Sequence, residues 1–457
     1  MLAHSKLWNI WTGVAVLLAS HAGLLAYSAT THSPTVDEPG HLVAGLVHWE
    51  FGRFDVYKVN PPLVHYLAAL PVIAAGYEAD WSEFYDHPGA RPEFSMGSAF
   101  IRANGERAIW LFTLARWACI PISLLGGLFC FLWSRELWNS NTAGLVSLTL
   151  WCFEPNILAH GELITCDGAG ASLGLGAGYL FWRWLRQPTG GRAAAAGAAL
   201  GLALLSKSTW IILCGLWPVL WLFWLAIFRF QISDLKSEPH TLPAPPSALR
   251  LAAILLLGLY ILNLGYAFDG SFTRLKDYTF ISRALTGEEK RRTPGNRFAH
   301  SWPGELPVPL PKPYLEGIDV QKSDFEGVHA NYLRGEWRSG RGWWYYYLYG
   351  LAVKTPHGTH VLLALAIVLM FYQSWTRTPQ AHAWPPVGLR DLVILLAPAV
   401  AVLVLVSAEM RMNQHVRYVL PVLGFTFVFI GSVAGSRSAS PHSSVQTTPG
   451  GSNSEIC

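Results

Sequence analysis

Apolar runs of about the length of one bilayer crossing recur along this chain, and the charged residues lie almost entirely between them. Charged side chains make up 14% of the 457 residues, against about 25% in an average soluble domain. The hydrocarbon interior of a bilayer excludes charges and offers no water to hydrogen-bond the backbone, so only helices and closed barrels, which pair all their backbone groups, can span it. The sequence therefore predicts an all-α polytopic membrane protein.

Ten runs are candidate spans when about 20 residues are taken as one crossing. They cover residues 7–29, 108–133, 142–159, 167–184, 193–206, 209–228, 250–267, 357–373, 391–408 and 416–433. The Ala- and Gly-rich run 193–206 is short. If it does not cross the membrane, every later segment has the opposite orientation. We expect a bundle of about 10–12 transmembrane helices.

Basic residues test this alternation, because cytoplasmic loops hold the excess of Lys and Arg. One side collects Lys6, Arg135, Arg183, Arg186, Arg192, Arg229, Lys236, Arg250, Arg377 and Arg390. Both termini are then cytoplasmic, and residues 30–107, 160–166, 268–356 and 409–415 are exported. We expect a multi-pass membrane protein. The first run also fits a cleaved signal peptide, which would leave residue 37 exported all the same.

The same alternation predicts four segments. Residues 1–267 form an N-terminal transmembrane catalytic module that includes the exported loop 30–107. Residues 268–356 form a large exported loop with an aromatic interfacial segment, and residues 357–433 form the C-terminal transmembrane helices. The Ser-, Gly- and Thr-rich tail 434–457 is expected to be disordered.

Two further apolar stretches are better interpreted as helices that lie on the membrane. Residues 61–76 follow Asn60 as a cap, with Pro61 and Pro62 in the first turn, and are short for a crossing. Residues 343–353 begin with an aromatic cluster of the kind found at membrane interfaces.

Cysteine and charge patterns exclude other classes of protein. The net charge of +4 is dispersed, with no basic cluster interleaved with aromatics, so no nucleic-acid partner is expected. Four cysteines lie inside apolar runs, Cys166 is alone in a short loop and Cys457 is the terminus. We expect neither a structural disulfide nor a cysteine metal site.

An acidic segment follows the first apolar run directly. Thr35 and Glu38 have the spacing of a capping box, so one interpretation is simply a helix start with Asp37 in its first turn. The functional interpretation is that Asp37, held at the membrane surface, is a general base for an acceptor hydroxyl. Glu38 then serves as both cap and support, and His41 follows on the same helix.

A second exported acidic cluster comprises His160, Glu162 and Asp167. An acid at the end of a membrane helix is costly unless it is partnered or faces water, which makes Asp167 a candidate site residue. The alternative is that Asp167 caps the next helix. Together with Asp37 these residues could bind a divalent ion, but no dense ligand motif exists, so no metal or other cofactor is predicted.

Cations near the exported side form the third set. Cations at the ends of membrane helices can bind an anionic ligand. The candidates are Lys58, Arg102, Arg107, Arg116, Lys207, Arg341, Lys354 and Arg417. Arg116 and Lys207 are the most informative because they lie within or at the end of apolar helices, although each of these cations could instead extend to lipid headgroups.

These residues resemble the motifs of membrane glycosyltransferases with the GT-C fold, specifically the protein O-mannosyltransferase and aminoarabinose lipid A transferase group. In chain order the matching segments are Asp37-Glu38, Asn60-Pro61-Pro62-Leu63, Leu114-Ala115-Arg116, Thr165-Cys166-Asp167, Leu205-Ser206-Lys207, Lys354-Thr355-Pro356 and Arg417-Tyr418-Val419-Leu420-Pro421. The motifs are short, and it is their order over most of the chain that is specific. The family usually has Lys or His before the two prolines, where this chain has Asn60, and Lys58 is the nearest substitute.

The resemblance implies an inverting glycosyltransferase of the bacterial plasma (inner) membrane that uses a polyprenyl-phosphate-linked sugar and a protein, lipid or glycan acceptor. A polyprenyl phosphate leaves as a stable anion, so sugar transfer from it would need positive charge rather than a general acid. The catalytic acids of the enzyme would be Asp37, Glu38 and Asp167. Its cations for the donor phosphate would be Lys58, Arg116, Lys207, Lys354 and Arg417, and residues near the acceptor would be His41, Glu162 and His160. The alternatives are a secondary transporter, a lipid-linked glycan ligase or polymerase, and a scaffold without activity.

Overall fold

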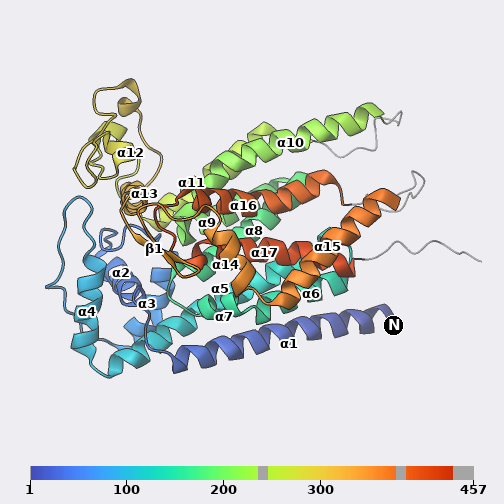
Figure 1. The fold of residues 1–457 in the computed structure, drawn as a ribbon, viewed down its shortest axis with the longest axis horizontal. Helices are drawn as coiled ribbons and strands as arrows, with labels where there is room; N and C mark the ends of the chain where they lie inside the picture. Colours follow the sequence, from blue (N-terminus) through green and yellow to red (C-terminus); the bar gives the residue numbers. More distant parts are fainter. Residues whose placement is uncertain (1, 235–244, 377–386, 436–457) are drawn as a thin grey trace, which may run out of the picture.

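The computed structural model describes residues 2–234, 245–376 and 387–435. Its long helices run side by side in one elongated bundle, and a smaller group of helices and loops covers one end (Figure 1). The N-terminus lies at the other end of the bundle. The predicted fold class, an all-α membrane bundle with one large polar excursion, is confirmed.

Each of the ten predicted runs is helical in the structure. The bundle contains α1 Leu2–Thr31, α5 Arg107–Leu137, α6 Asn141–Phe153, α7 Pro155–Gly161, α8 Cys166–Arg186, α9 Gly190–Ser206, α10 Ile212–Asp234, α11 Ala248–Gly265, α15 His357–Thr376, α16 Leu389–Ala408 and α17 Leu420–Ile430. Within the described ranges, 6 helices are long and apolar enough to cross a membrane, or 7 if one bent helix pair counts as a span. The chain is therefore an integral membrane protein.

Three predicted spans fall short of that length and composition test, because the structure places them beside protein rather than lipid. Helices α6 and α9 have 13 and 17 residues. Helix α8 has 21 residues, with an acid in its first turn and two arginines in its last, and it is buried along nearly its whole length. Helices packed against other membrane helices favour small residues over long apolar ones, so the apolar signal of α8 is weak, whereas α6 and α9 are apolar but short.

Close approach of α8 and α5 to their neighbours depends on glycine. A Cβ atom added at Gly174 would lie 1.8 Å from the Trp210 ring, and one at Gly126 would lie 2.2 Å from the Trp151 ring. The two tryptophans are fully buried. The glycines therefore provide the space into which the indole rings pack at the centre of the bundle.

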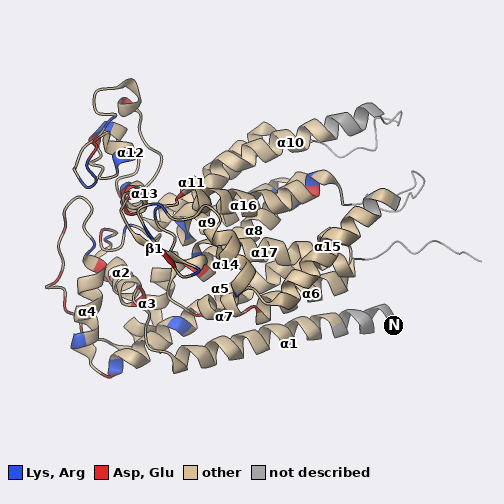
Figure 2. Cartoon of the chain, in the orientation of Figure 1, with Lys and Arg blue, Asp and Glu red and all other residues tan. Residues whose placement is uncertain are grey.

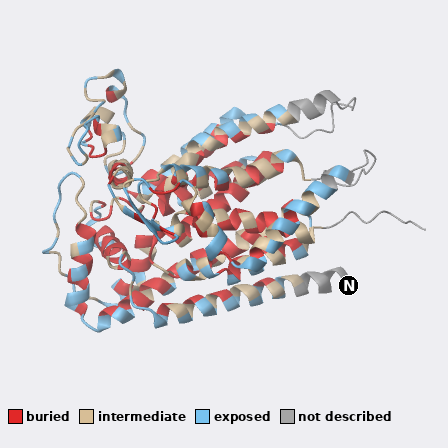
Figure 3. Cartoon of the chain, viewed as in Figure 1, coloured by how far each residue is buried: buried red, intermediate tan, exposed pale blue. Residues whose placement is uncertain are grey.

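The outer helices face lipid, as their exposed side chains show. In Figure 3 the bundle helices carry buried residues inward and exposed ones outward. On α15 the exposed side chains include Val361, Leu365 and Val368, which share one helix face. An apolar exposed stripe of this kind is expected where a helix contacts acyl chains.

We call segments 32–106 and 266–345, at the covered end of the bundle, the head. Its regular elements are α2 Glu38–Phe51, α3 Leu63–Ala75, α4 Pro92–Asn104, α12 Arg283–Thr286, α13 Lys312–Phe325, β1 Ala330–Leu333 and β2 Glu336–Ser339. The two strands form an antiparallel hairpin in which Ala330 faces Ser339. Charged residues gather in the head and are sparse along the bundle (Figure 2).

Short 3-10 turns complete the described chain. They are η1 Ser208–Ile211, η3 Leu275–Asp277, η4 Trp302–Glu305, η5 Val416–Val419 and η6 Gly431–Ala434. The predicted tail lies outside the described residues from 436 onward.

The first predicted interfacial helix is present as α3, but its cap differs from the prediction. The N-cap position is Pro62, with no side-chain hydrogen bond. Asn60 does not cap the helix, because its Oδ1 instead accepts a hydrogen bond from the Cys166 thiol at 2.9 Å. Asn60 therefore ties the loop before α3 to the start of α8.

The second predicted interfacial helix is α14 Tyr346–Lys354. It is followed by α15 after a bend of 109° at Thr355 and Pro356. Proline lacks the N–H that a continuous helix needs and disfavours helical geometry in the residue before it. The bend leaves Lys354 at the junction between an interfacial helix and a span.

Four of the predicted cytoplasmic arginines lie together at the end of the bundle opposite the head, while the side chains of Lys6, Arg229, Lys236 and Arg377 lie outside what the structure describes. Arg135, Arg183, Arg186 and Arg192 line one cavity of about 500 Å³. The Arg135 guanidinium also lies 5.9 Å from the Trp11 ring, near the start of α1. The alternation of basic loops in the sequence thus corresponds to one physical face.

Candidate active site

Asp37 occupies the N-cap position of α2, directly after the loop that leaves α1. Its side chain is partly buried and lines a cavity of about 210 Å³ in the head side of the bundle. The Arg417 Nη2 atom lies 2.6 Å from Asp37 Oδ2. A residue near the start of the chain is thus paired with one in η5, before the last helix.

Asp167 and Lys207 extend this pair into a chain of four charges. Asp167 lies in the first turn of α8, where the helix dipole favours an acid, and Lys207 follows α9 directly. The Lys207 ammonium bonds to Asp167 Oδ1, and the Arg417 Nε atom lies 3.5 Å from Asp167 Oδ2. We call Asp37, Arg417, Asp167 and Lys207 the ion-pair chain.

The ion-pair chain is balanced in charge, and its Asp167–Lys207 half is buried whereas Asp37 and Arg417 are partly buried. The side chains of Asp167 and Lys207 are 5% and 8% exposed, and all four residues line the same cavity. Two carboxylates and two cations sum to zero, which limits the cost of burying them. The Lys207 ammonium also lies 5.7 Å from the centre of the Tyr418 ring. The sequence predicted each of these charged residues, and the structure brings them together.

Glu38 and Arg116 form a second, separate pair. Glu38 is fully buried, and its carboxylate accepts hydrogen bonds from Arg116 Nε at 2.8 Å and Nη2 at 2.6 Å. Burial alone would raise the pKa of the Glu38 carboxyl, but Arg116 outweighs it and leaves that pKa below its usual value. Glu38 Oε2 also accepts from the Thr35 N–H at 2.8 Å, so one half of the predicted capping box is present.

The remaining Arg116 donors bind backbone oxygens at the end of α1. Nη1 donates to Ala29 at 3.2 Å and His32 at 2.8 Å, and Nη2 donates to Ser33 at 3.0 Å. Arg116 is 1% exposed. These contacts tie α1 to α5 and to the start of α2. Together with the hydrogen bonds to Glu38, they engage every nitrogen of the guanidinium.

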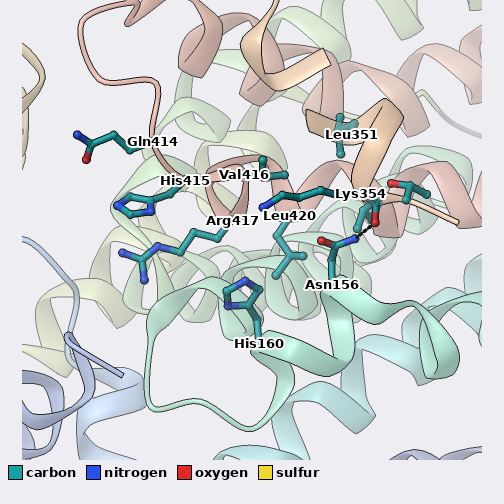
Figure 4. A pocket seen from close by; sticks show the side chains of 11 residues that line it. Asn156, His160, Leu351, Lys354, Gln414, His415, Val416, Arg417 and Leu420 are labelled. Atoms are coloured by element: carbon teal, nitrogen blue, oxygen red, sulfur yellow. Dashed lines mark hydrogen bonds between the residues drawn. The ribbon is translucent and has the colours of Figure 1, made fainter. Parts of the chain in front are cut away.

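A second cavity, of about 160 Å³, adjoins the ion-pair chain (Figure 4). Lys354, His160, His415 and Arg417 extend toward it from three segments, α14, α7 and the start of η5, and Leu351, Leu420 and Leu423 supply apolar walls. Asn156 donates a hydrogen bond to the Lys354 carbonyl at 3.0 Å, which joins α7 to the end of α14. Arg417 lines both cavities; we call the cavity that holds Asp37 and Asp167 the acidic cavity and the one that holds Lys354 the cationic cavity.

The other predicted residues divide between these cavities and the surrounding structure. His41 lines the acidic cavity and His160 lines the cationic one. Glu162 accepts from the Ser28 hydroxyl at 2.7 Å, and burial raises its pKa. Lys58 is paired with Glu316 at 2.9 Å and lines neither cavity. The structure thus does not bring Lys58 to the ion-pair chain.

The structure also adds residues that sequence reasoning missed. Arg91 lines the acidic cavity, bonds to Glu93 and lies 2.7 Å from Asp324. Burial raises the pKa of Glu93. His415 lines both cavities. Arg91 precedes α4 and Asp324 lies at the end of α13, and neither belongs to a recognisable motif, so no local signal could have found them.

The five cysteines in the described part of the chain are free. In that same part, no group of three or more His, Cys, Asp or Glu side chains is arranged to hold a metal ion. The carboxylates of Asp37 and Asp167 face guanidinium and ammonium groups instead.

Comparison with known proteins was made at the levels of family, sequence and structure. No protein-family model matches the chain, and no curated protein sequence matches it. Among solved structures, the chain is similar to the crystal structure of ArnT from Cupriavidus metallidurans bound to undecaprenyl phosphate, with 15% identity and a TM-score of 0.46. The match covers 93% of this chain and 60% of that chain.

The apo structure of the same ArnT matches with 15% identity and a TM-score of 0.35, covering 93% of this chain and 78% of that chain. The chain thus spans less than two thirds of the first of these neighbours. Both are structures of ArnT.

Proposed function

We propose that this protein is a membrane-embedded glycosyltransferase that moves a sugar from a polyprenyl-phosphate donor to an acceptor hydroxyl on the head side of the membrane. The observation that carries the proposal is the convergence of Asp37, Asp167, Lys207 and Arg417 on one cavity. These residues come from four separated segments, each of which resembles a family motif. The adjoining cavity, lined by Lys354, supports a site for an anion.

In the proposed reaction, Asp37 takes the proton of the acceptor hydroxyl. The hydroxyl oxygen forms a bond to the anomeric carbon while the bond from that carbon to the phosphate oxygen breaks. The polyprenyl phosphate leaves with the bonding electrons and one additional negative charge. A single displacement inverts the configuration at the anomeric carbon.

The cations act where this charge develops. Lys354 and Arg417 face the cationic cavity and would stabilise the departing phosphate, because charges already in place need no rearrangement during the reaction. Asp167 and Lys207 orient Arg417 between the two cavities. Glu38 and Arg116 hold the loop that carries Asp37.

The donor lipid fits this arrangement physically. The cationic cavity has apolar walls from α14 and α17, and the bend between α14 and α15 places Lys354 beside a lipid-facing helix. A phosphate at Lys354 would leave its polyprenyl chain at the membrane. The sugar would then extend past Arg417 into the acidic cavity.

The test uses purified protein in proteoliposomes with a polyprenyl-phosphate hexose that carries a labelled sugar. Wild type is expected to transfer the label to acceptor and release polyprenyl phosphate, whereas Asp37→Asn, with unchanged folding, is expected to lose about 10²–10⁴-fold in rate. Asp277→Asn, an exposed acid of the head, is the matched control.

Other outcomes decide against the proposal. Near-normal turnover in Asp37→Asn would remove the base from the mechanism. Movement of intact donor or free sugar across the bilayer would indicate a transporter, and release of polyprenyl diphosphate from a diphosphate-linked glycan would indicate a ligase or polymerase.

A further inference from the structure

Three histidines of the head form a row of hydrogen-bonded rings. His41 and His48 lie on α2 and His65 lies on α3, with exposures of 2%, 6% and 0%. His41 Nδ1 is 2.7 Å from His65 Nε2, and His65 Nδ1 is 3.2 Å from His48 Nε2. The row ends where His48 Nδ1 lies 2.6 Å from the Arg53 carbonyl oxygen.

The carbonyl fixes the direction of every hydrogen bond in the row. A carbonyl oxygen only accepts, so His48 Nδ1 carries the hydrogen, and a neutral imidazole has only one N–H. His48 Nε2 must then accept from His65 Nδ1, and His65 Nε2 must accept from His41 Nδ1. His41 is left with its hydrogen on Nδ1 and a free lone pair on Nε2.

Burial keeps the rings neutral, as this assignment requires. Removal from water lowers the pKa of His41 and of His48 to about 4 and lowers that of His65 well below its usual value. A charged ring would donate from both nitrogens and break the row. The rings of His41 and His65 also contact Tyr57, whose ring centre lies 4.5 Å from that of His41 and 5.7 Å from that of His65.

His41, whose Nε2 carries the free lone pair, lines the acidic cavity. His41 follows Asp37 by four residues on α2, so the two side chains share one side of the helix start. Its Nε2 has no hydrogen-bond partner among the residues that the structure describes. The charged groups acting on His41 are Asp37, Asp167, Arg417 and Glu38.

We propose that His41 Nε2 accepts a hydrogen bond from a hydroxyl of the transferred sugar that does not react, and that His65 and His48 are positioning residues that hold the His41 tautomer. The inference rests on the proposed function and extends it, because it makes His41 a specificity determinant for polyhydroxylated donors. The hydroxyl that reacts is bound by Asp37, and the two groups have separate tasks. A donor that lacks the matching hydroxyl would leave a buried acceptor unpaired.

The first experiment examines the tautomers and does not depend on any activity. In ¹⁵N-histidine-labelled protein in nanodiscs, the signal assigned through His41→Asn is expected to show a protonated Nδ1 and an unprotonated Nε2. In His65→Phe this His41 signal is expected to move toward a mixture of tautomers. His65→Gln, whose amide oxygen can accept from His41 Nδ1, is expected to restore it. A protonated Nε2 of His41 in wild type would overturn the relay.

The second experiment measures binding without turnover. In an Asp37→Asn background, the Kd of polyprenyl-phosphate hexose is compared with that of its monodeoxy analogues. One analogue is expected to bind about 10-fold more weakly or worse, as for an unpaired buried acceptor. The penalty is expected to vanish in His41→Phe, to shrink in His65→Phe and to persist in His65→Gln and in the control His300→Phe, which alters an exposed histidine.

A merely structural role of His65 would change stability but leave the ratio between the two Kd values unchanged. Equal binding of the hexose and all its analogues to the Asp37→Asn protein would refute the sugar contact. If the donors bind with the expected ratio but wild type cleaves no donor, the proposed function fails while the contact stands.

Discussion

The guanidinium of Arg417 lies 2.6 Å from the carboxylate of Asp37, although the two residues stand near opposite ends of the sequence. The same guanidinium lies 3.5 Å from Asp167. Arg417 therefore joins both acidic motifs and stands at the boundary of the acidic and cationic cavities.

Replacement of Arg417 by lysine is expected to lower the transfer rate by about 10- to 10³-fold, because an ammonium is a point charge and does not span two carboxylates as a planar guanidinium does. Thermal unfolding should change little, since one positive charge remains. The steady-state rate with saturating donor provides the measurement, and Arg338→Lys on the exposed hairpin provides the control. A wild-type rate in Arg417→Lys would show that the bridge has no role in turnover.

Lys354→Met is expected to weaken binding of polyprenyl phosphate by about 10-fold or more, because hydrogen bonds to charged groups contribute about 1.5–3 kcal/mol. The long apolar side chain of Met keeps the packing at the end of α14. Binding is measured as the lipid-dependent rise in unfolding temperature. Lys290→Met, at an exposed position of the head, should bind as wild type does. Unchanged affinity in Lys354→Met would place the phosphate elsewhere.

Substitutions of Glu38 and Arg116 are expected to have coupled effects on the stability of the protein. Breaking a buried pair by removing one partner costs about 3–5 kcal/mol, because the other charge stays buried. Glu38→Gln and Arg116→Met should each destabilise the detergent-purified protein, and the double variant should lose clearly less than their sum. The free energy of unfolding is measured by heat or denaturant for the wild type, the two single variants and the double variant, which together form a double-mutant cycle. Strict additivity would mean that the two side chains do not interact.

Acid should destabilise the head through the histidine row. His41 and His48 have a pKa of about 4 in the folded chain and about 6.5 when unfolded, so below 6.5 the unfolded state binds more protons. Stability is therefore full above pH 6.5 and falls as the pH drops toward 4. The unfolding temperature, measured as a function of pH, tests this expectation. The charged groups that act on His41 are Asp37, Glu38, Asp167 and Arg417.

In His41→Phe/His48→Phe, the decline in stability between pH 6.5 and 4 is expected to be shallower. The exposed-site control His300→Phe should retain the wild-type slope. An equal slope in all three proteins would show that other groups govern the acid response.

The histidine row shows which contacts a sequence pattern can predict and which it cannot. His41 and His48 are seven residues apart, a spacing that puts both on one face of a helix, and this was a signal available in the sequence. His65 lies on another helix, and nothing in the sequence specifies that α3 packs its ring between the other two. The capping role predicted for Asn60 failed for a similar reason, because the thiol of Cys166 from α8 is its partner.

By itself, the sequence determined the membrane bundle, the ten helical runs, the polar head and the list of charged residues that can do chemistry. These follow from hydropathy and from local motifs, which each act within a few turns of chain. The tertiary structure alone decided the pairing: Arg417 with Asp37, Lys207 with Asp167, Arg116 with Glu38, and Lys58 with Glu316 away from the site. Electrostatic and hydrogen-bond partners are selected over a few ångströms, and only packing brings distant segments that close.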